Sequence, residues 1–533
     1  MPDQQHHPEH EKQSHEQHEH SGGMQSGGMG MRGVSRPMPL HQHHQKHEES
    51  HGKESQGHEG HQGHGHMSMS PEHREKMLHM HHRQTLWCYW FIVMAGFWTM
   101  MAPLTFSYGS GAVDVAGGRE VWLSTAGRAA AMTWSDLICG FLLIVLGWRA
   151  LTPNRPVSMW GACFVGIWMN IAPVLFWAPT AGAYYNATAV GTLVIAVTIL
   201  IPGMPNMIMY MKMGNPVPRG WSYNPSSWPQ RWIMIAAGFA GWMASRYLGA
   251  FQLGYIEEIW DPFFGSQSRQ VLNSDMSHMW PVSDAAFGAF AYTFECLMGF
   301  MGAPSRWRTM PWMVTFFGIL VIPLGLVHIA LVISQPVVVG AWCTFCLLAA
   351  AIMLPMIPLE VDEVIAMGQH VKQRTRAGEG FWRVFWKGGD PDGSEPDERT
   401  PPLADFPKRP MALLKAGFWG MSAPWNLTVS AIVGVGLLFV PWLLGLEKPA
   451  SAIFHLGGSL AVVFAVIAMG EAVRLTRFLN VLVGLVLAIG PWLTNGGVAA
   501  GVIGLLAGVA LIGLSLRKGP VRERFGSWDR WVK

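Results

Sequence analysis

The stretch "QPVVVGAWCTFCLLAAAIML", residues 335–354, is strongly apolar and holds two cysteines three positions apart. Its length is close to the roughly 20 residues with which an α-helix crosses the hydrocarbon core of a bilayer. Cys343 and Cys346 are open to three interpretations: a reactive dithiol, two metal ligands, or two small apolar residues in a buried helix. Six cysteines in 533 residues is an ordinary number, so the rest of the chain has to decide between them.

The composition indicates a membrane protein. The chain is 50% apolar and 13% charged, whereas a soluble domain is about 25% charged. Its mean hydropathy is +0.21 although residues 1–85 are strongly hydrophilic. Because backbone groups in lipid must be hydrogen-bonded within their own segment, long apolar runs are helices, and we expect an all-α, polytopic membrane protein. The net charge of +3 gives no indication of nucleic acid as a partner.

Twelve apolar runs have the length of a membrane span, and we expect them to form three groups of four helices. The predicted spans are 87–106, 130–150, 158–178, 187–209, 231–252, 284–303, 312–334, 338–358, 427–446, 452–471, 476–493 and 497–516. The expected domains are a disordered tail 1–85, a four-helix module 86–210, a central four-helix domain 231–367, a linker 368–426, a second module 427–516 and a tail 517–533.

The charges of the connections predict the orientation. Connections after even-numbered spans carry most of the Arg and Lys residues, such as Arg149, Arg219 and Arg306, whereas those after odd-numbered spans hold only Arg119, Arg128, Arg269 and Lys448. By the positive-inside rule, both termini and all even-numbered connections are cytoplasmic. We therefore expect a multi-pass protein of the cell (inner) membrane.

The two outer groups contain an internal repeat. "GFWTMMAP" (96–103), "GIWMNIAP" (166–173), "GVGLLFVPW" (434–442) and "GLVLAIGPW" (484–492) share a Gly-x6-Pro spacing, which predicts four copies of a two-helix unit. A small residue allows close helix packing, and a proline near the end of a span terminates or kinks it. These stretches resemble the SPW repeat of bacterial membrane proteins, a family with no established chemistry, so we expect structural or interaction modules.

The predicted topology separates the cysteine pair from the other cysteines. Cys343 and Cys346 fall in the first turns of an inward-running helix, near the extracytoplasmic face, where disulfide chemistry is sustained in bacteria. The positive end of a helix macrodipole favours thiolate there, and the i, i+3 spacing places both sulfurs on one side. The remaining cysteines lie near the cytoplasmic face or inside spans and are expected to be buried apolar residues: Cys88, Cys139, Cys163 and Cys296.

Histidines gather in the N-terminal tail, where residues 6–82 hold 19 of the 23. Neutral imidazoles bind Zn, Cu or Ni, so the tail could bind metal weakly. It lacks a fixed ligand spacing and a cysteine, and we define no metal site and expect no tightly bound metal. A flexible polar tail is an equal alternative.

Residues 231–367 resemble the vitamin K epoxide reductase family, a four-helix membrane fold that couples dithiols to quinones. "VVVGAWCTFCLLAAAIML" (337–354) is similar to that family's CxxC helix, and "VLNSDMSHMWPVSDAAFGAFAY" (271–292) to its outer loop and following helix. The resemblance implies that Cys346 attacks the ring of a ubiquinone- or menaquinone-type quinone, while Cys343 exchanges disulfides with incoming thiols. Ser274 stands at the family's loop serine, and Tyr292 lies in the next span.

Two ionisable residues inside or beside spans are further candidates for the quinone pocket, because such groups are costly in lipid. Arg246 lies near the outer end of its span and Asp284 begins the next one. Either residue could line the pocket, or the two could form a salt bridge between helices.

The central domain departs from the family in its outer loop. Family members usually carry a second cysteine pair there, but residues 253–283 contain none. Three possibilities follow: external thiols reach Cys343 directly, a separate thioredoxin-like or other thiol protein supplies the shuttle, or the dithiol-oxidising role is lost.

We therefore expect a membrane thiol–quinone oxidoreductase, a quinone-dependent enzyme with Cys343 and Cys346 as its catalytic residues. The alternative is a non-enzymatic membrane scaffold or metal-handling protein that keeps a degenerate reductase-like domain.

Overall fold

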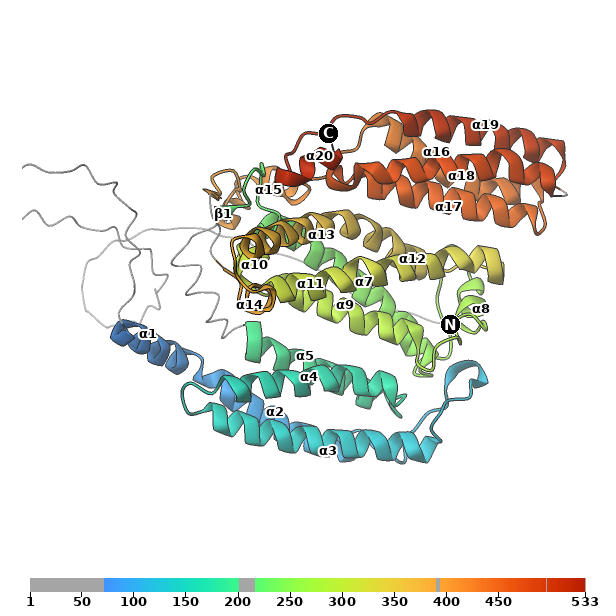
Figure 1. Ribbon diagram of the computed structural model, residues 1–533. Coiled ribbons are helices and arrows are strands. Elements are labelled where there is room, and N and C mark those ends of the chain that lie inside the picture. Colours follow the sequence, from blue (N-terminus) through green and yellow to red (C-terminus); the bar gives the residue numbers. More distant parts are fainter. Residues whose placement is uncertain (1–70, 201–215, 390–393, 495, 533) are drawn as a thin grey trace, which may run out of the picture. The chain divides into compact units, whose positions relative to one another are not determined.

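The long apolar runs are helices in the computed structural model, which describes residues 71–200, 216–389, 394–494 and 496–532 (Figure 1). Only two strands occur among these residues, β1 (Pro216–Val217) and β2 (Glu395–Pro396), and they pair antiparallel. The predicted all-α fold is therefore confirmed. For residues 1–70 the expected disorder of the tail lies outside the described residues.

The first group begins earlier than expected. Its elements are α1 (Pro71–Gln84), α2 (Leu86–Thr105), η1 (Ala116–Gly118), α3 (Thr125–Ala150), α4 (Pro156–Leu175), α5 (Ala181–Ile195) and η2 (Ala196–Leu200). The 14 residues of α1 lie within the segment 1–85 that we expected to be disordered. Within α1, Lys76 forms an exposed ion pair with Glu72. Near the end of α1, the ring Nε2 of His82 lies 3.0 Å from the carbonyl oxygen of Leu151, so this helix contacts the turn after α3.

The central group contains α7, α9, α11, α12 and α13, which contact one another as a bundle (Figure 1). Its elements are α7 (Trp228–Gln252), α8 (Gln267–Leu272), α9 (Asp284–Phe300), α10 (Arg306–Thr309), α11 (Pro311–Val321), α12 (Pro323–Ser334), η3 (Gln335–Val339), α13 (Thr344–Arg376) and α14 (Phe381–Lys387).

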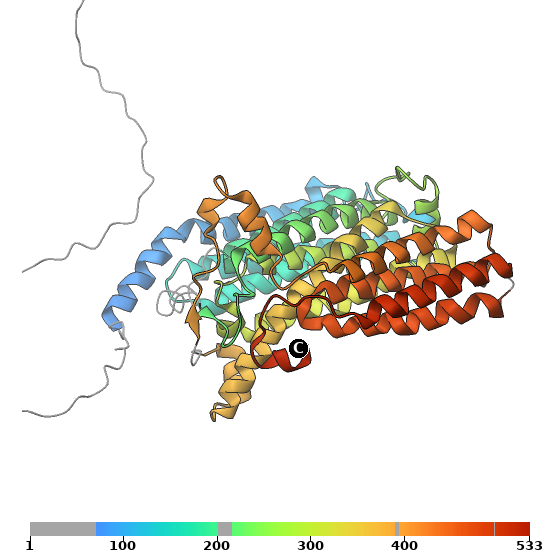
Figure 2. The ribbon, with the colours of Figure 1, turned by 90° about the horizontal axis from the view of Figure 1, so that it is seen from above.

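In the third group, α16, α17, α18 and α19 lie alongside one another (Figure 2). The elements from the linker onward are η4 (Leu403–Asp405), α15 (Pro410–Gly417), α16 (Trp425–Leu444), α17 (Ala450–Met469), η5 (Glu471–Phe478), α18 (Leu479–Ile489), η6 (Gly490–Leu493), α19 (Gly497–Leu516), η7 (Gly526–Trp528) and α20 (Asp529–Val532).

Ten helical segments among the described residues are long and apolar enough to cross a membrane, two fewer than predicted. Two predicted spans, 231–252 and 284–303, do not meet this criterion. The first lies in α7, which carries Arg246 within its apolar run, and the second lies in α9, which has only 17 residues. The ten segments are Leu86–Thr105, Thr125–Ala150, Pro156–Leu175, Ala181–Leu200, Pro311–Val339, Thr344–Arg376, Trp425–Leu444, Ala450–Met469, Glu471–Leu493 and Gly497–Leu516.

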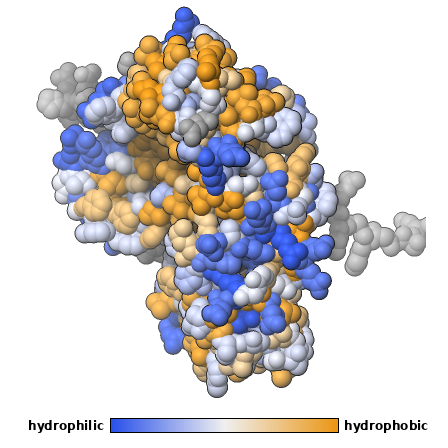
Figure 3. Space-filling view, turned by 90° about the vertical axis from the view of Figure 1, so that its right-hand side faces the viewer, coloured by the Kyte–Doolittle hydropathy of each residue, from blue (hydrophilic) through white to orange (hydrophobic). Residues whose placement is uncertain are grey.

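Large apolar side chains remain exposed on these helices, as a surface that faces lipid requires. Trp442 and Leu493 each expose 81% of their surface and Val498 exposes 72%. Figure 3 shows the end of the molecule that carries α8, where hydrophilic and hydrophobic patches lie next to each other. The polytopic membrane architecture is thus confirmed.

Each copy of the Gly-x6-Pro repeat places its glycine where two antiparallel helices cross. A methyl group added at Gly96 would lie 2.6 Å from the carbonyl oxygen of Gly140 on the following helix. The same holds for Gly166 and Gly191, Gly434 and Gly458, and Gly484 and Gly508, with distances of 2.8, 2.7 and 2.7 Å. The repeat glycines are therefore needed for close backbone approach in all four helix pairs.

We expect Gly434→Ala to destabilise the third group by about 1–3 kcal/mol, because the added methyl forces α16 and α17 apart. Gly436→Ala in the same helix is the matched control, since nothing lies within 4 Å of its added methyl. The measurement is the thermal unfolding of each variant in detergent. Equal midpoints for the two variants would contradict the role of the crossing.

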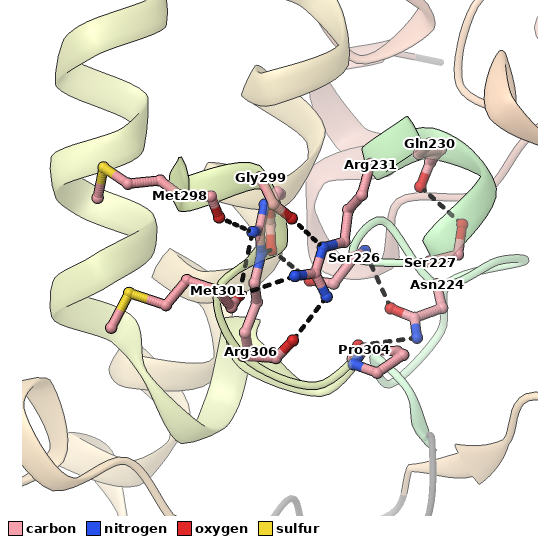
Figure 4. Close-up of polar contacts among 12 residues, drawn as sticks. Asn224, Ser226, Ser227, Gln230, Arg231, Met298, Gly299, Met301, Pro304 and Arg306 are labelled. Atoms are coloured by element: carbon pink, nitrogen blue, oxygen red, sulfur yellow. Dashed lines mark hydrogen bonds and ion pairs between the residues drawn. The ribbon is translucent and has the colours of Figure 1, made fainter. Parts of the chain in front are cut away.

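Two buried arginines, Arg231 and Arg306, bind the carbonyl oxygens at the end of α9 (Figure 4). The guanidinium of Arg231 donates to the carbonyl oxygens of Gly299, Met301 and Gly302 at 2.7, 2.9 and 2.7 Å. These carbonyls end α9, and a cation at a helix C-terminus is favourable because it complements the helix dipole. Arg231 exposes 2% of its surface, so this residue is part of the core.

Candidate functional site

Cys343 and Cys346 form a disulfide at the start of α13, with their Cα atoms 5.3 Å apart. Gly340, with φ of 78°, reverses the chain after η3, and Cys343 is the N-cap of α13. The helix therefore begins at Thr344 rather than at the predicted residue 338. The backbone N–H of Cys346 donates to Sγ of Cys343 at 3.2 Å, so the sulfur occupies the position of a capping acceptor at the positive end of the helix.

The disulfide is buried. Cys343 exposes 0% of its surface and Cys346 exposes 7%. Apolar residues from α7, α8 and α12 cover the two sulfurs: Leu248, Phe251, Val271, Leu272 and Val332. Because α8 belongs to the loop between α7 and α9, this outer loop (residues 253–283) separates the disulfide from solvent.

Asp261 joins the outer loop to the CxxC motif. Its carboxylate accepts hydrogen bonds from the backbone N–H and the hydroxyl of Thr344 at 2.9 and 2.5 Å. The same carboxylate accepts the N–H groups of Phe263 and Phe264 at 2.9 and 2.8 Å and the hydroxyl of Ser268. One side chain therefore organises the turn in the loop and holds it against the first residue of α13.

Burial raises the pKa of Asp261, but the hydrogen bonds from Phe264, Ser268 and Thr344 outweigh it and hold this pKa well below its ordinary value. A carboxyl group with a depressed folded-state pKa stabilises the folded state above its unfolded-state pKa, which is about 3.9 for Asp. The stabilisation is lost as the pH falls below that value, so the contact between the loop and α13 is fully formed at neutral pH.

A second side chain holds the other side of Cys343. The backbone N–H of Trp342 donates to Oε1 of Gln267 at 3.0 Å. Aromatic rings add to the contact, since Phe264 stacks on Trp342 at 6.1 Å and Phe345 meets Tyr247 edge-on at 5.0 Å. The residues before and after Cys343 are therefore both fixed by the outer loop.

The first group supports the outer loop from behind. The guanidinium of Arg119 donates to the carbonyl oxygens of Ser277 and His278 at 3.4 and 3.5 Å, and the indole N–H of Trp177 donates to that of Pro281 at 3.0 Å. The third group also reaches the site, because Nζ of Lys448 donates to the carbonyl oxygen of Val338 at 2.8 Å. Both flanking groups thus contact segments next to the disulfide.

Two of the predicted pocket residues, Ser274 and Arg246, form their hydrogen bonds with groups outside the CxxC motif. The hydroxyl of Ser274 donates to the carbonyl oxygen of Val271 at 2.7 Å, inside the outer loop. The guanidinium of Arg246 donates to the hydroxyl of Thr188 at 2.7 Å and lies over the rings of Tyr184 and Tyr185. The charge of Arg246 is therefore used in the contact between α7 and α5.

The other two predicted residues lie at different depths. Asp284 accepts hydrogen bonds from Gln252 at 2.5 Å and from Ser277 at 3.3 Å, so it fixes the end of the loop, and it forms no ion pair with Arg246 among the described residues. Tyr292 exposes 2% of its surface, and its hydroxyl donates to the carbonyl oxygen of Ala349 at 3.3 Å. Ala349 follows Cys346 by three residues, so Tyr292 lies about one helical turn below the disulfide.

The remaining cysteines are unpaired, and Cys88, Cys139 and Cys163 are buried while Cys296 is partly buried. Within residues 71–200, 216–389, 394–494 and 496–532, no cluster of three or more His, Cys, Asp or Glu side chains could hold a metal ion. The histidine-rich tail, for which weak metal binding and a flexible polar segment were equal alternatives, lies mostly outside this part of the chain.

The resemblance noted in the sequence agrees with a comparison against known families. Residues 232–361 match the vitamin K epoxide reductase family. The match covers about a quarter of the chain and includes the outer loop, the disulfide and Tyr292. No curated protein and no solved structure matches the chain significantly. The central group is therefore similar to the vitamin K epoxide reductase family over these residues, which supports an oxidoreductase type of function, and the flanking helix pairs lie outside the match.

Asp261 and Gln267, which join the outer loop to the start of α13, were not predicted as site residues from the sequence. Asp261 belongs to the motif "IWDPFF" (259–264) of the outer loop. The motif does contain a recognisable feature, because an Asp followed by Pro often accepts the N–H groups two and three residues later. The contact with Thr344 depends on the tertiary fold and leaves no local pattern.

We expect Asp261→Asn to speed the reduction of the disulfide by a small water-soluble dithiol about 10- to 100-fold. The amide nitrogen of asparagine would face N–H or O–H donors, and the loss of a charged hydrogen bond, about 1.5–3 kcal/mol, shifts the loop towards opening. The rate is measured by quenching the reduction with an alkylating reagent at set times and determining the number of alkylated thiols from the intact mass of the protein. Asp275→Asn, at an exposed position of the same loop, is the control, and equal rates for both variants would contradict the role of Asp261.

Proposed function

We propose that this chain is a membrane thiol–quinone oxidoreductase in which Cys343 and Cys346 carry electrons from extracytoplasmic thiols to a quinone of the ubiquinone or menaquinone type. The observation that carries the proposal is the Cys343–Cys346 disulfide at the N-terminus of α13, within the residues that match the vitamin K epoxide reductase family. A disulfide needs a thiol donor to be reduced, and the family's chemistry supplies the quinone as the electron acceptor.

The reaction balances without a further reagent. A thiolate of the donor attacks Sγ of Cys343, the bond to Cys346 breaks, and a second donor thiol resolves the mixed disulfide, so that the donor is oxidised and the pair is reduced. The Cys346 thiolate then adds to the quinone ring, and the Cys343 thiolate attacks Sγ of Cys346 and re-forms the disulfide. Two electrons and the two protons of the donor thiols end on the quinol.

The environment of the pair supports these roles. The N–H of Cys346 stabilises negative charge on Sγ of Cys343, which favours the thiolate needed for the resolving step. Tyr292 lies on the membrane side of Cys346, and we assign its hydroxyl to the quinone side of the site. Asp284 and Ser274 shape the outer loop, and Arg246 supports the helix that faces the pair.

The electron donor reaches Cys343 from outside the chain, because residues 253–283 contain no cysteine. In the oxidised form Cys343 is fully buried beneath the outer loop. We therefore propose that the loop opens at the Asp261 contact to admit a small thiol or a separate thioredoxin-like protein. The loop charges support a location in the cell (inner) membrane with both termini cytoplasmic and the CxxC motif near the extracytoplasmic face.

Reconstitution tests the proposal. The purified chain in lipid nanodiscs is mixed with a water-soluble dithiol and a short-chain ubiquinone or menaquinone, and quinol formation is followed by absorbance. We expect turnover with at least one quinone. Rates equal to those of empty nanodiscs with both quinones would contradict the proposal and leave the non-enzymatic alternative.

The position of the pair is tested in intact cells with a membrane-impermeant alkylating reagent. We expect labelling of Cys343 or Cys346 only after mild reduction, because the pair is oxidised and lies near the outer face. Absence of labelling under every condition would contradict both the topology and the accessibility of the pair.

A further inference from the structure

A cavity of about 690 Å³ lies at the opposite end of α13 from the disulfide. Three separate stretches of the chain line it: residues 218–220, the last turns of α13 from Ala366 to Arg376, and residues 524–530. Trp307 of α10 adds a further wall. The volume falls within the range of about 300–1,000 Å³ that is typical of sites for small molecules.

Hydrogen bonds hold the three stretches together. Oε1 of Gln369 on α13 accepts the indole N–H of Trp221 at 3.0 Å, and Nε2 of Gln369 donates to the carbonyl oxygen of Phe525 at 2.9 Å. The rings of Trp221 and Phe525 meet edge-on at 5.2 Å. The walls of the cavity are thus joined by hydrogen bonds and a ring contact among buried and half-buried groups.

The lining is strongly basic, and we refer to it as the basic cavity. It contains five Lys or Arg side chains and a single carboxylate, Asp529, which also accepts the N–H of Phe525 at 2.8 Å. The described residues provide no hydrogen bond or ion pair for four of the cationic groups. These four are Arg219, Lys372, Arg376 and Arg524. Like charges gathered without counter-charges repel one another, so an anion bound among them is favoured.

Two aromatic residues of the lining also lack polar partners. Nε1 of Trp307 and Nε2 of His370 are buried without a hydrogen-bond partner among the described residues. Trp307 exposes 2% of its surface and His370 exposes 3%. Buried ring nitrogens are normally hydrogen-bonded, so the interior of the basic cavity is built for a polar occupant that the chain does not itself supply.

The position of the cavity distinguishes between two sources of such an anion. The apolar part of α13 ends at Glu360, and Lys372 and Arg376 follow it by 12 and 16 residues, a rise of about 18 and 24 Å along the helix. The headgroup layer of a bilayer is only about 5–8 Å thick on each side. The part of the basic cavity that is lined by Lys372 and Arg376 therefore extends past the lipid headgroups into water.

We propose that the basic cavity binds a soluble phosphate-bearing anion of the size of pyrophosphate or a nucleotide. The phosphate oxygens are bound by guanidinium and ammonium groups from all three stretches, chiefly those of Lys372, Arg376 and Arg524. Arg and Lys recognise phosphate by charge, and Arg also by paired hydrogen bonds. This site is independent of the redox chemistry proposed for Cys343 and Cys346.

Calorimetric titration with pyrophosphate tests the proposal, using the full chain in nanodiscs of zwitterionic phosphatidylcholine. We expect saturable binding that weakens as the salt concentration rises, since exposed charges are screened. Arg376→Gln and Lys372→Gln should each weaken it at least tenfold. Lys415→Gln removes an exposed charge outside the cavity and should leave the affinity unchanged. Both cavity positions are exposed, so we expect unchanged thermal unfolding without ligand.

Two results would overturn the proposal. The first is no binding of pyrophosphate, or binding that Arg376→Gln and Lys415→Gln affect equally. The second is displacement of pyrophosphate when phosphatidylglycerol replaces part of the lipid, with the displacement lost in Lys372→Gln. That outcome would assign the cavity to the phosphate of an anionic lipid headgroup.

Discussion

Cys346→Ala is expected to lower dithiol-dependent quinone reduction to the background of empty nanodiscs, a loss of at least about 100-fold, because it removes the nucleophile and the covalent route to the quinone. The fold should survive, since Cys346 contributes only a small apolar side chain to the cover of the site. Quinol formation at saturating dithiol is the measurement. A rate within a factor of two of the wild-type rate would exclude this pair as the redox centre.

Cys343→Ala separates the roles of the two sulfurs. This variant keeps the Cys346 thiol but cannot resolve an adduct, so we expect one equivalent of quinone to be bound covalently and no turnover. Intact-protein mass measurement reports the adduct. Cys296→Ala is the matched control, because Cys296 is an unpaired cysteine of the same domain, and it should react at the wild-type rate.

The sequence was sufficient to predict the helices and their pairing in the flanking groups. Apolar runs of about 20 residues form helices in lipid, because only a helix satisfies their backbone hydrogen bonds within the segment. The Gly-x6-Pro repeat predicted four helix pairs, and in the structure each pair crosses at two glycines, such as Gly96 and Gly140. The two spans that fell short, α7 and α9, are those with Arg246 and with only 17 residues. Both helices pack against each other and against the rest of the central bundle, and hydropathy does not measure such packing.

The candidate site was predicted less completely. The spacing of Cys343 and Cys346 was enough to predict a pair that could bridge, and the structure has them bonded. The hydrogen bonds that hold the outer loop against this pair come from Asp261 and Gln267, more than 70 residues earlier. Arg246 and Asp284 were considered together because both are charged near the outer face, but each binds a different neighbour. Such pairings depend on helix rotation, which a single sequence does not determine.

Glu363→Ala is expected to destabilise the central bundle by about 3–5 kcal/mol, because it leaves a buried arginine without its counter-charge. Glu363 accepts two hydrogen bonds from Arg306 at 2.6 and 2.5 Å, and the two side chains expose only 1% and 2% of their surface. Ser226 donates to the same carboxylate, so the pair also joins the segment before α7 to α13. Thermal unfolding of the full chain in detergent measures the loss.

Two comparisons identify the cause of this destabilisation. Glu72→Ala breaks an exposed pair with Lys76, in which the side chains expose 79% and 76%, and should leave the unfolding midpoint unchanged, since such pairs contribute little. Replacing both partners, with Arg306→Met and Glu363→Leu, should recover part of the stability, because no buried charge then remains. Arg306 also donates to the carbonyl oxygen of Met298 at 2.7 Å, so recovery should be incomplete. If Glu363→Ala and Glu72→Ala have the same midpoint, the buried ion pair does not stabilise this end of the bundle.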